Sequence, residues 1–218
     1  MNYYYKELAI NLSFAVLPVI GGGIKFKLLD KASRWLLLAV TFSFITECLA
    51  FFAAKLYHNN LPVYNIGNII QLFIIALYFN SCVKLFNKKN IGFYIGLFSV
   101  TFGTLNLVFF ESITRYNTNF FLYQTVLIFI MGAFYFRQLL LPAFLMKFGT
   151  PHLWFIIILV SFYTFNFFTL SLYGYFSDVL NNHTELIDNV IVGFSALSNA
   201  AFAGIFFFYP KIELSNAG

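Results

Sequence analysis

The stretch from Thr46 to Phe73 reads TECLAFFAAKLYHNNLPVYNIGNIIQLF and places scarce polar groups inside apolar runs. Glu47 lies in the first run, and Asn68 and Gln71 lie in the next one. A carboxyl group within a bilayer costs ~2.5–3.5 kcal/mol on insertion scales, so it marks a candidate functional site. The chemistry open to this group is proton exchange or the binding of a small ligand.

Helical spacing indicates that Glu47 points toward other helices. Ser43, Glu47, Ala50 and Ala54 form a narrow stripe of small and polar side chains. A short turn after Lys55 makes the next run an antiparallel neighbour, so Glu47 and Gln71 can face each other at one level. The candidate binding residues across the chain are Glu47, Asn65, Asn68, Gln71, Asn106, Gln124, Tyr163, Asn166 and Asp188.

Two structural interpretations of these residues stay open. The amides and hydroxyls can serve only as hydrogen bonds between helices, worth about 0.6 kcal/mol each on average. A protonated Glu47 bonded to Gln71 or Asn68 can be a purely structural lock. Most polar stripes lie in the outer halves of their helices, on the side of the membrane away from the cytoplasm. This predicts a polar cavity that opens outward, above an apolar plug formed by the inner halves.

Sequence patterns for other chemistry are missing. The triplet Gly21–Gly23 lacks the flanking residues of a phosphate-binding loop. His58, His152 and His183 fall in connectors without a neighbouring metal ligand, and the last apolar run has no lysine for a retinal Schiff base. We therefore expect no catalytic residue, no metal and no cofactor. A lipid-modifying enzyme is the least supported alternative.

Composition assigns the chain to the membrane. Its 218 residues are 61% hydrophobic, 22% aromatic and 10% charged, and the mean hydropathy is +0.81. Soluble domains carry about 25% charged residues. The net charge of +5 comes from basic residues scattered through short connectors, so nucleic acid is not an expected partner.

Seven apolar runs are long enough, or nearly so, to cross a bilayer, which takes roughly 20 residues. The connectors carry turn signals such as YHNNLP and NKKN. The first run is the weakest, because it is short and contains Pro18. The sequence thus predicts one all-α domain over residues 1–218, an integral membrane seven-helix bundle with spans at about 8–24, 35–56, 63–84, 91–110, 119–141, 152–175 and 186–209.

The basic residues predict the orientation of this bundle. Cytoplasmic connectors carry an excess of Lys and Arg. With seven spans, three of the 13 basic residues fall on the side of the N-terminus: Lys6, Lys55 and Arg115. The other ten are Lys25, Lys27, Lys31, Arg34, Lys84, Lys88, Lys89, Arg137, Lys147 and Lys211. We therefore expect the N-terminus outside and the C-terminus in the cytoplasm.

Three segments carry a resemblance to known proteins: TECLAFFAAKLYHNNLPVYNIGNIIQLFIIALYF, PHLWFIIILVSFY and IDNVIVGFSALSNAAFAGIFF. They resemble a family of uncharacterised seven-helix membrane proteins of Bacteroidetes. Gln71 departs from the pattern, since an acid is expected there, and this weakens any paired-carboxylate role. Such proteins are similar to membrane parts found with sensor histidine kinases, so the resemblance implies a role in signalling.

The leading hypothesis is a sensor or binding module in the bacterial inner (cytoplasmic) membrane. Its pocket would be formed by Glu47, Asn68, Gln71, Asn106 and Asn166. The protein would signal the binding of an unknown ligand, or the state of the membrane, to a membrane or cytoplasmic protein partner. Alternatives are a small proton-coupled transporter, against which no internal repeat is visible, and a structural subunit of a larger membrane complex. The bilayer is a partner in each case.

Overall fold

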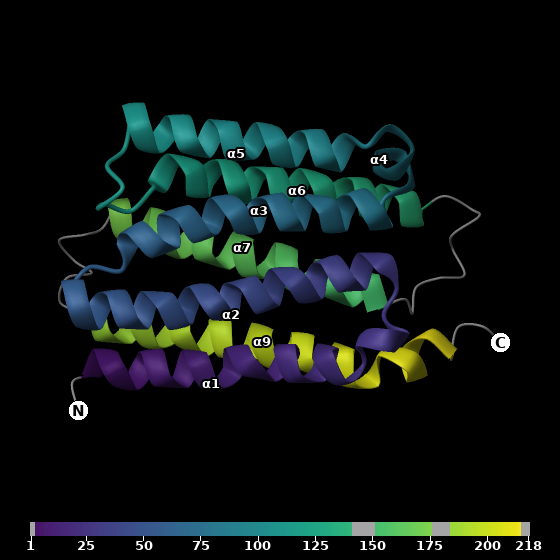
Figure 1. Cartoon of the computed structure of the whole chain (residues 1–218), viewed down its shortest axis with the longest axis horizontal. Helices are drawn as coiled ribbons and strands as arrows, with labels where there is room; N and C mark the ends of the chain where they lie inside the picture. The colour runs from purple at the N-terminus through teal and green to yellow at the C-terminus, as the bar shows by residue number, and fades with distance from the viewer. Residues whose placement is uncertain (1–2, 141–150, 176–183, 215–218) are drawn as a thin grey trace.

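A computed structural model describes residues 3–140, 151–175 and 184–214, with side chains described for 9–140, 151–169 and 189–209. Within these ranges the chain is helical and contains no strand, which confirms the all-α prediction. Figure 1 shows long helices lying side by side. The elements are α1 (Tyr3–Ile24), the 3₁₀ turn η1 (Phe26–Leu28), α2 (Lys31–Tyr57), α3 (Leu61–Cys82), α4 (Lys84–Lys89), α5 (Ile91–Phe109), α6 (Thr118–Leu139), α7 (Pro151–Tyr175) and α9 (Thr184–Leu214).

Local capping chemistry fixes the helix ends. The carboxylate of Asp30 accepts a hydrogen bond from the Ser33 amide at 2.7 Å and begins α2. His58 ends α2 in the left-handed conformation with φ 54°, and Asn90 separates α4 from α5 with φ 51°. The side chain of Asn117 accepts from the Phe120 amide and begins α6. Polar residues thus turn the chain sharply between apolar helices.

The long helices alternate in direction, so that α1 begins at one end of the bundle and α9 ends at the other (Figure 1). α2 packs on α3, α3 on α5, α6 on α7 and α7 on α9. α1 packs against both α2 and α9, which joins the two ends of the chain. Fully buried side chains at the centre include Leu36, Leu72, Phe79, Phe155 and Phe206.

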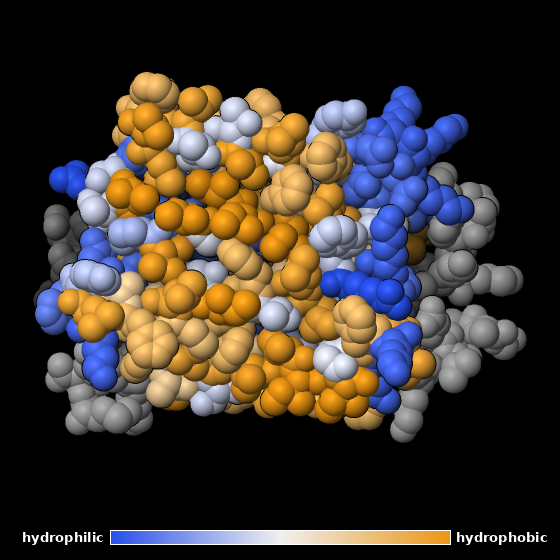
Figure 2. Space-filling view, viewed as in Figure 1, coloured by the Kyte–Doolittle hydropathy of each residue, from blue (hydrophilic) through white to orange (hydrophobic). Residues whose placement is uncertain are grey.

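Six of these helices are long and apolar enough to cross a membrane: α2, α3, α5, α6, α7 and α9. α1 has a shorter apolar stretch, Ala9–Ile24. Figure 2 shows a hydrophobic band across the middle of the bundle and hydrophilic residues gathered where α4 lies. We call this the basic end. Its described cationic residues are Lys25, Lys27, Lys31, Arg34, Lys84, Lys88, Lys89 and Arg137.

Glycines allow α3 to approach its neighbours closely. A Cβ on Gly92 of α5 would lie 2.5 Å from the Ala76 carbonyl oxygen and 2.9 Å from the Asn80 Cα. A Cβ on Gly67 would lie 2.6 Å from the Cγ2 of Thr46 on α2. Small residues at such contacts are typical of membrane helix pairs. They bring the polar faces of α2 and α3 together at the level of Glu47.

Candidate functional site

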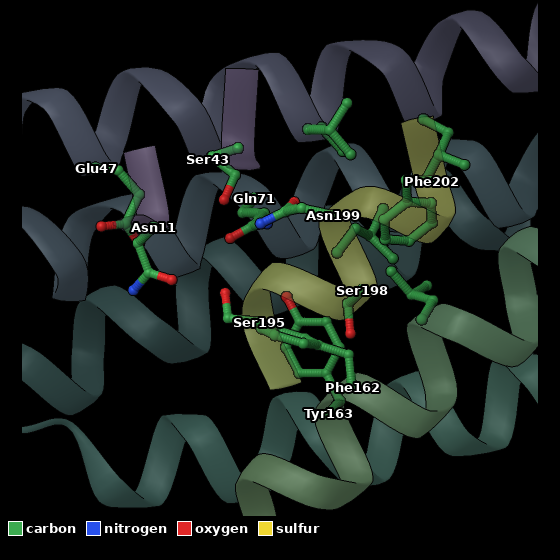
Figure 3. Close-up of a pocket in the computed structure, with 16 residues that line it drawn as sticks. Asn11, Ser43, Glu47, Gln71, Phe162, Tyr163, Ser195, Ser198, Asn199 and Phe202 are labelled. Atoms are coloured by element: carbon green, nitrogen blue, oxygen red, sulfur yellow. The ribbon is translucent and has the colours of Figure 1, made fainter. Parts of the chain in front are cut away.

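A cavity of about 80 Å³ lies between α1, α2, α3, α7 and α9. A single water needs roughly 10–15 Å³ of such space, so the cavity can hold several waters or one small polar molecule. Figure 3 shows polar side chains from these helices directed toward the same space. The lining residues are Asn11, Ala15, Leu36, Ala39, Val40, Ser43, Glu47, Gln71, Ile75, Leu159, Phe162, Tyr163, Ser195, Ser198, Asn199 and Phe202.

Glu47 supplies the one acidic group among these lining residues. Its Oε2 accepts a hydrogen bond of 2.7 Å from the Tyr64 hydroxyl, which lies on the neighbouring helix α3. The predicted partners of Glu47 were Gln71 or Asn68. Gln71 lines the same cavity as Glu47, near the middle of α3, but the structure assigns the hydrogen bond to Tyr64.

Several polar groups in the cavity lack a protein partner. The side chains of Ser43, Gln71 and Asn199 form no hydrogen bond with any residue in the described part of the chain. The Oδ1 of Asn11 is fully buried and is likewise unpaired within that part. Buried polar groups in folded proteins nearly always have a partner. The Asn11 Oδ1 therefore needs such a partner, and the half-buried side chains of Ser43, Gln71 and Asn199 are open to water or a small ligand.

Apolar residues close the cavity toward the basic end. Leu36, Ile75 and Phe202 form this wall, and Leu36 and Ile75 are fully buried. Phe155 and Phe206 lie beyond it, with ring centroids 4.9 Å apart. This arrangement corresponds to the apolar plug expected from the sequence, and it isolates the polar cavity from the basic end.

Tyr163 and Gln124 extend the polar cluster toward α6. The Nε2 of Gln124 donates a hydrogen bond of 2.9 Å to the hydroxyl of Tyr163, which lines the cavity. Gln124 is fully buried, and its Oε1 has no partner in the described ranges. Gln124 therefore holds the Tyr163 hydroxyl from the side of α6 and does not itself line the cavity.

Asn65 and Asn106 occupy a different place, at the end of the bundle opposite the basic end. The Nδ2 of Asn65 donates to the carbonyl oxygens of Ile113 and Arg115 at 2.8 and 2.7 Å. The Nδ2 of Asn106 donates to Glu111 Oε2 and Asn117 Oδ1, both at 2.6 Å. These two amides hold the connector between α5 and α6, and they do not line the cavity.

The remaining candidate residues lie apart from the cavity lining. Asn68 is half-buried on α3. Asn166 is also half-buried, and its Nδ2 donates to the Phe162 carbonyl one turn earlier in α7. Asp188 belongs to α9, but its side chain is outside the described residues. The structure therefore brings together Glu47, Gln71 and Tyr163 from the predicted set.

A second polar cluster lies at the basic end. Asp30 Oδ2 and His152 Nε2 are 2.8 Å apart and join the beginnings of α2 and α7. Burial alone would raise the pKa of the Asp30 carboxyl, but hydrogen bonds and charge from His152 and the Ser33 amide hold it well below its ordinary value. The Ser33 hydroxyl donates to the Tyr209 hydroxyl at 3.2 Å. This cluster ties α2, α7 and α9 together.

Sequence reasoning missed Asn11, Ser198 and the Asp30–His152 pair. Asn11 lies in the weakest apolar run, and the members of the pair are 122 positions apart. The helical stripe containing Ser195 and Asn199 was a signal for α9, although neither residue was among the candidates. Within the described ranges no group of three or more His, Cys, Asp or Glu side chains is placed to hold a metal.

The fold and the site together define a multi-pass membrane protein with a polar cavity inside its helix bundle. Comparison with protein-family models, curated proteins and solved structures finds no match.

Proposed function

We propose that this protein is a membrane sensor or binding module, which holds a small polar ligand beside Glu47 and relays its presence to a partner protein. The observation that carries this proposal is the set of unpaired polar groups in the cavity. Ser43, Gln71 and Asn199 come from three helices and converge without a partner among the described residues. All three side chains are half-buried, so a ligand in the cavity can reach their polar groups.

The chemistry of the lining restricts the ligand. No Lys, Arg or His lies among the 16 lining residues, and Glu47 brings the one carboxyl group. A ligand that donates hydrogen bonds or carries a positive charge fits such a lining, because it would oppose the Glu47 oxygens. The volume of about 80 Å³ limits that ligand to a few heavy atoms.

The proposal includes seven spans with the N-terminus outside and the basic end in the cytoplasm of a bacterial inner membrane. α1 has 22 residues, which is about 33 Å of helix at 1.5 Å per residue, and its apolar stretch Ala9–Ile24 covers about 24 Å of a core of about 30 Å. α1 also packs between α2 and α9. Eight described cations at one end, against Lys55 and Arg115 at the other, support this orientation.

The relay would run along the helices that line the cavity. α2, α7 and α9 extend from the cavity to the basic end, where Asp30, His152 and Tyr209 join them. A ligand that changes the packing of these helices at the cavity would change that junction. The family resemblance supports a signalling partner, in the membrane or in the cytoplasm, at this end.

Ligand retention tests the proposal directly. The protein would be purified from native membranes in mild detergent, and bound small molecules would be identified by mass spectrometry for wild type and Glu47→Gln. Glu111→Gln is the matched control, because Glu111 binds Asn106 and lies outside the cavity. We expect a small molecule that the wild type and Glu111→Gln retain and that Glu47→Gln loses.

The opposite result would favour a structural role. If no small molecule is retained and a stoichiometric protein partner survives Glu47→Gln, the cavity has no binding function. The protein would then be a structural subunit of a larger membrane complex.

A proton-coupled transporter is the second candidate, and the polar cluster at the basic end favours it. The helices that line the cavity also carry Asp30, Ser33, His152 and Tyr209 beyond the apolar wall. A second polar cluster of this kind would suit the exit path of a transported proton or ligand. Proteoliposomes loaded with a pH-sensitive dye should show a Glu47-dependent proton flux for a transporter and none for a sensor.

A further inference from the structure

A groove on the surface of the basic end is separate from the cavity. It has a volume of about 520 Å³ and is built by η1 and the first two turns of α2. Its lining combines cationic and apolar side chains: Phe26, Leu29, Asp30, Lys31, Arg34, Trp35 and Leu38. The groove lies where the hydrophilic end of the bundle meets the hydrophobic band (Figures 1 and 2).

Arg34 is held in place at the rim of this groove. Its Nε donates a hydrogen bond of 3.0 Å to the Leu29 carbonyl, and its guanidinium lies 5.2 Å from the centre of the Phe26 ring. No described residue accepts a hydrogen bond from its terminal amino groups. A guanidinium fixed in this way presents paired N–H donors that match the geometry of a phosphate. Exposed Lys31 adds a second positive charge to the same groove.

The acidic residue in the groove is already engaged. Asp30 Oδ1 accepts from the Ser33 amide at 2.7 Å, and Oδ2 lies 2.8 Å from His152 Nε2. Both oxygens are therefore directed to α2 and α7. Asp30 keeps its negative charge, so Lys31 and Arg34 leave the groove with a net charge of about +1, which still favours a negative group.

The apolar part of the groove continues into the membrane. Leu38 lies seven residues after Lys31 on α2, which is about 10 Å of helix. Leu38 is 46% exposed, and Trp35 is half-buried on the same helix. A ligand that touches both parts must have an anionic head and an apolar chain. Anionic phospholipids of the bilayer have this form, whereas a zwitterionic lipid would bring a cation beside Arg34.

We propose that this groove is a binding site for an anionic phospholipid, with the phosphate on Arg34 and Lys31 and an acyl chain along Trp35 and Leu38. A cation near the bilayer surface favours an anionic lipid by about fivefold. At about 20 mol% anionic lipid, a net fivefold preference would fill roughly half of the grooves, against about one in five without any preference.

Trp35 provides a reporter inside the groove. The chain has two tryptophans, Trp35 and Trp154, so the variant Trp154→Phe leaves Trp35 alone. The full-length variant would be reconstituted in vesicles of phosphatidylcholine with about 20 mol% phosphatidylglycerol, at which a fivefold preference fills roughly half of the grooves. Bromine, which quenches tryptophan on contact, would be placed on the phosphatidylglycerol in one sample and on the same fraction of phosphatidylcholine in the other.

We expect brominated phosphatidylglycerol to quench Trp35 at least twofold more than brominated phosphatidylcholine. Adding Lys31→Gln and Arg34→Gln should remove this excess. Adding Lys88→Gln and Lys89→Gln, on α4 at the same end, should leave it unchanged. Equal quenching by the two lipids in Trp154→Phe would overturn the proposal, and so would an excess that survives the loss of Lys31 and Arg34.

Discussion

Asn65 holds the connector between α5 and α6 against the beginning of α3, and its replacement by alanine has a calculable cost. Two hydrogen bonds of 2.8 and 2.7 Å to the carbonyl oxygens of Ile113 and Arg115 disappear, together with one of 3.3 Å from the Asn117 amide. A hydrogen bond contributes about 1 kcal/mol net. Asn65→Ala should therefore lower the free energy of unfolding by about 2–3 kcal/mol.

The assay is thermal unfolding in detergent, followed by intrinsic fluorescence. For a chain of about 200 residues, 1 kcal/mol shifts the melting temperature by about 2–4 °C, so Asn65→Ala should melt about 4–12 °C lower. Asn68→Ala is the matched control, three residues further along α3. Asn68 is half-buried and forms no hydrogen bond with a described residue. Asn68→Ala should therefore lower the free energy of unfolding by less than about 1 kcal/mol.

The comparison separates a structural role for Asn65 from a binding role. If Asn65→Ala melts like the wild type but loses a ligand that the wild type retains, Asn65 belongs to a binding site and the reasoning from its hydrogen bonds is wrong. If both variants melt equally low, helix packing around α3 governs stability, and the connector contributes little.

Three further predictions concern the packing, the basic end and the cavity. Gly92→Ala should cost about 1–3 kcal/mol in thermal unfolding, because its Cβ would lie 2.5 Å from a backbone carbonyl oxygen of α3. The carboxyl pKa of Asp30 is below its ordinary value of 3.8 in the folded protein, so its stabilising effect is complete above that value and is lost as pH falls. The melting difference between the wild type and Asp30→Asn should thus be larger near about pH 5.5 than near about pH 3. Tyr64→Phe should shift the infrared carboxyl band that disappears in Glu47→Gln, since Tyr64 donates to that carboxyl group at 2.7 Å.

Each of these predictions has a control or an opposing outcome. Gly193→Ala on α9 meets nothing within 4 Å and should be neutral or stabilising by up to about 1 kcal/mol. A pH-independent difference for Asp30→Asn would mean that the carboxylate gains nothing from its neighbours. Tyr57→Phe, at a position 76% exposed, should leave the carboxyl band unmoved, and an equal shift there would exclude a specific hydrogen bond.

Local sequence features were enough to place helices along the chain. Apolar runs and polar turns are properties of neighbouring residues, so α5, predicted from residue 91, begins at Ile91. The short turn at His58 also made α2 and α3 adjacent, which brought Glu47 and Gln71 to one cavity.

The roles of individual amides could not be read in the same way. Asn65 and Gln71 both carry an amide side chain and lie in the same apolar run. Asn65 binds the connector between α5 and α6, whereas Gln71 lines the cavity. That difference depends on the path of residues far along the chain. Asn11 and the Asp30–His152 pair were missed for the same reason, since their neighbours come from α7 and α9.

The position of α9 beside the cavity has a consequence for biosynthesis. Glu47 enters the membrane with α2, but Ser195 and Asn199 of α9 follow about 150 residues later in the sequence. At about 5–20 residues per second, the ribosome needs roughly 7–30 s to add them. During that interval one side of the cavity is open, and the carboxyl group of Glu47 lacks its final surroundings. Insertion of α9 therefore adds the missing side of the cavity and shields the Glu47 carboxyl group from lipid.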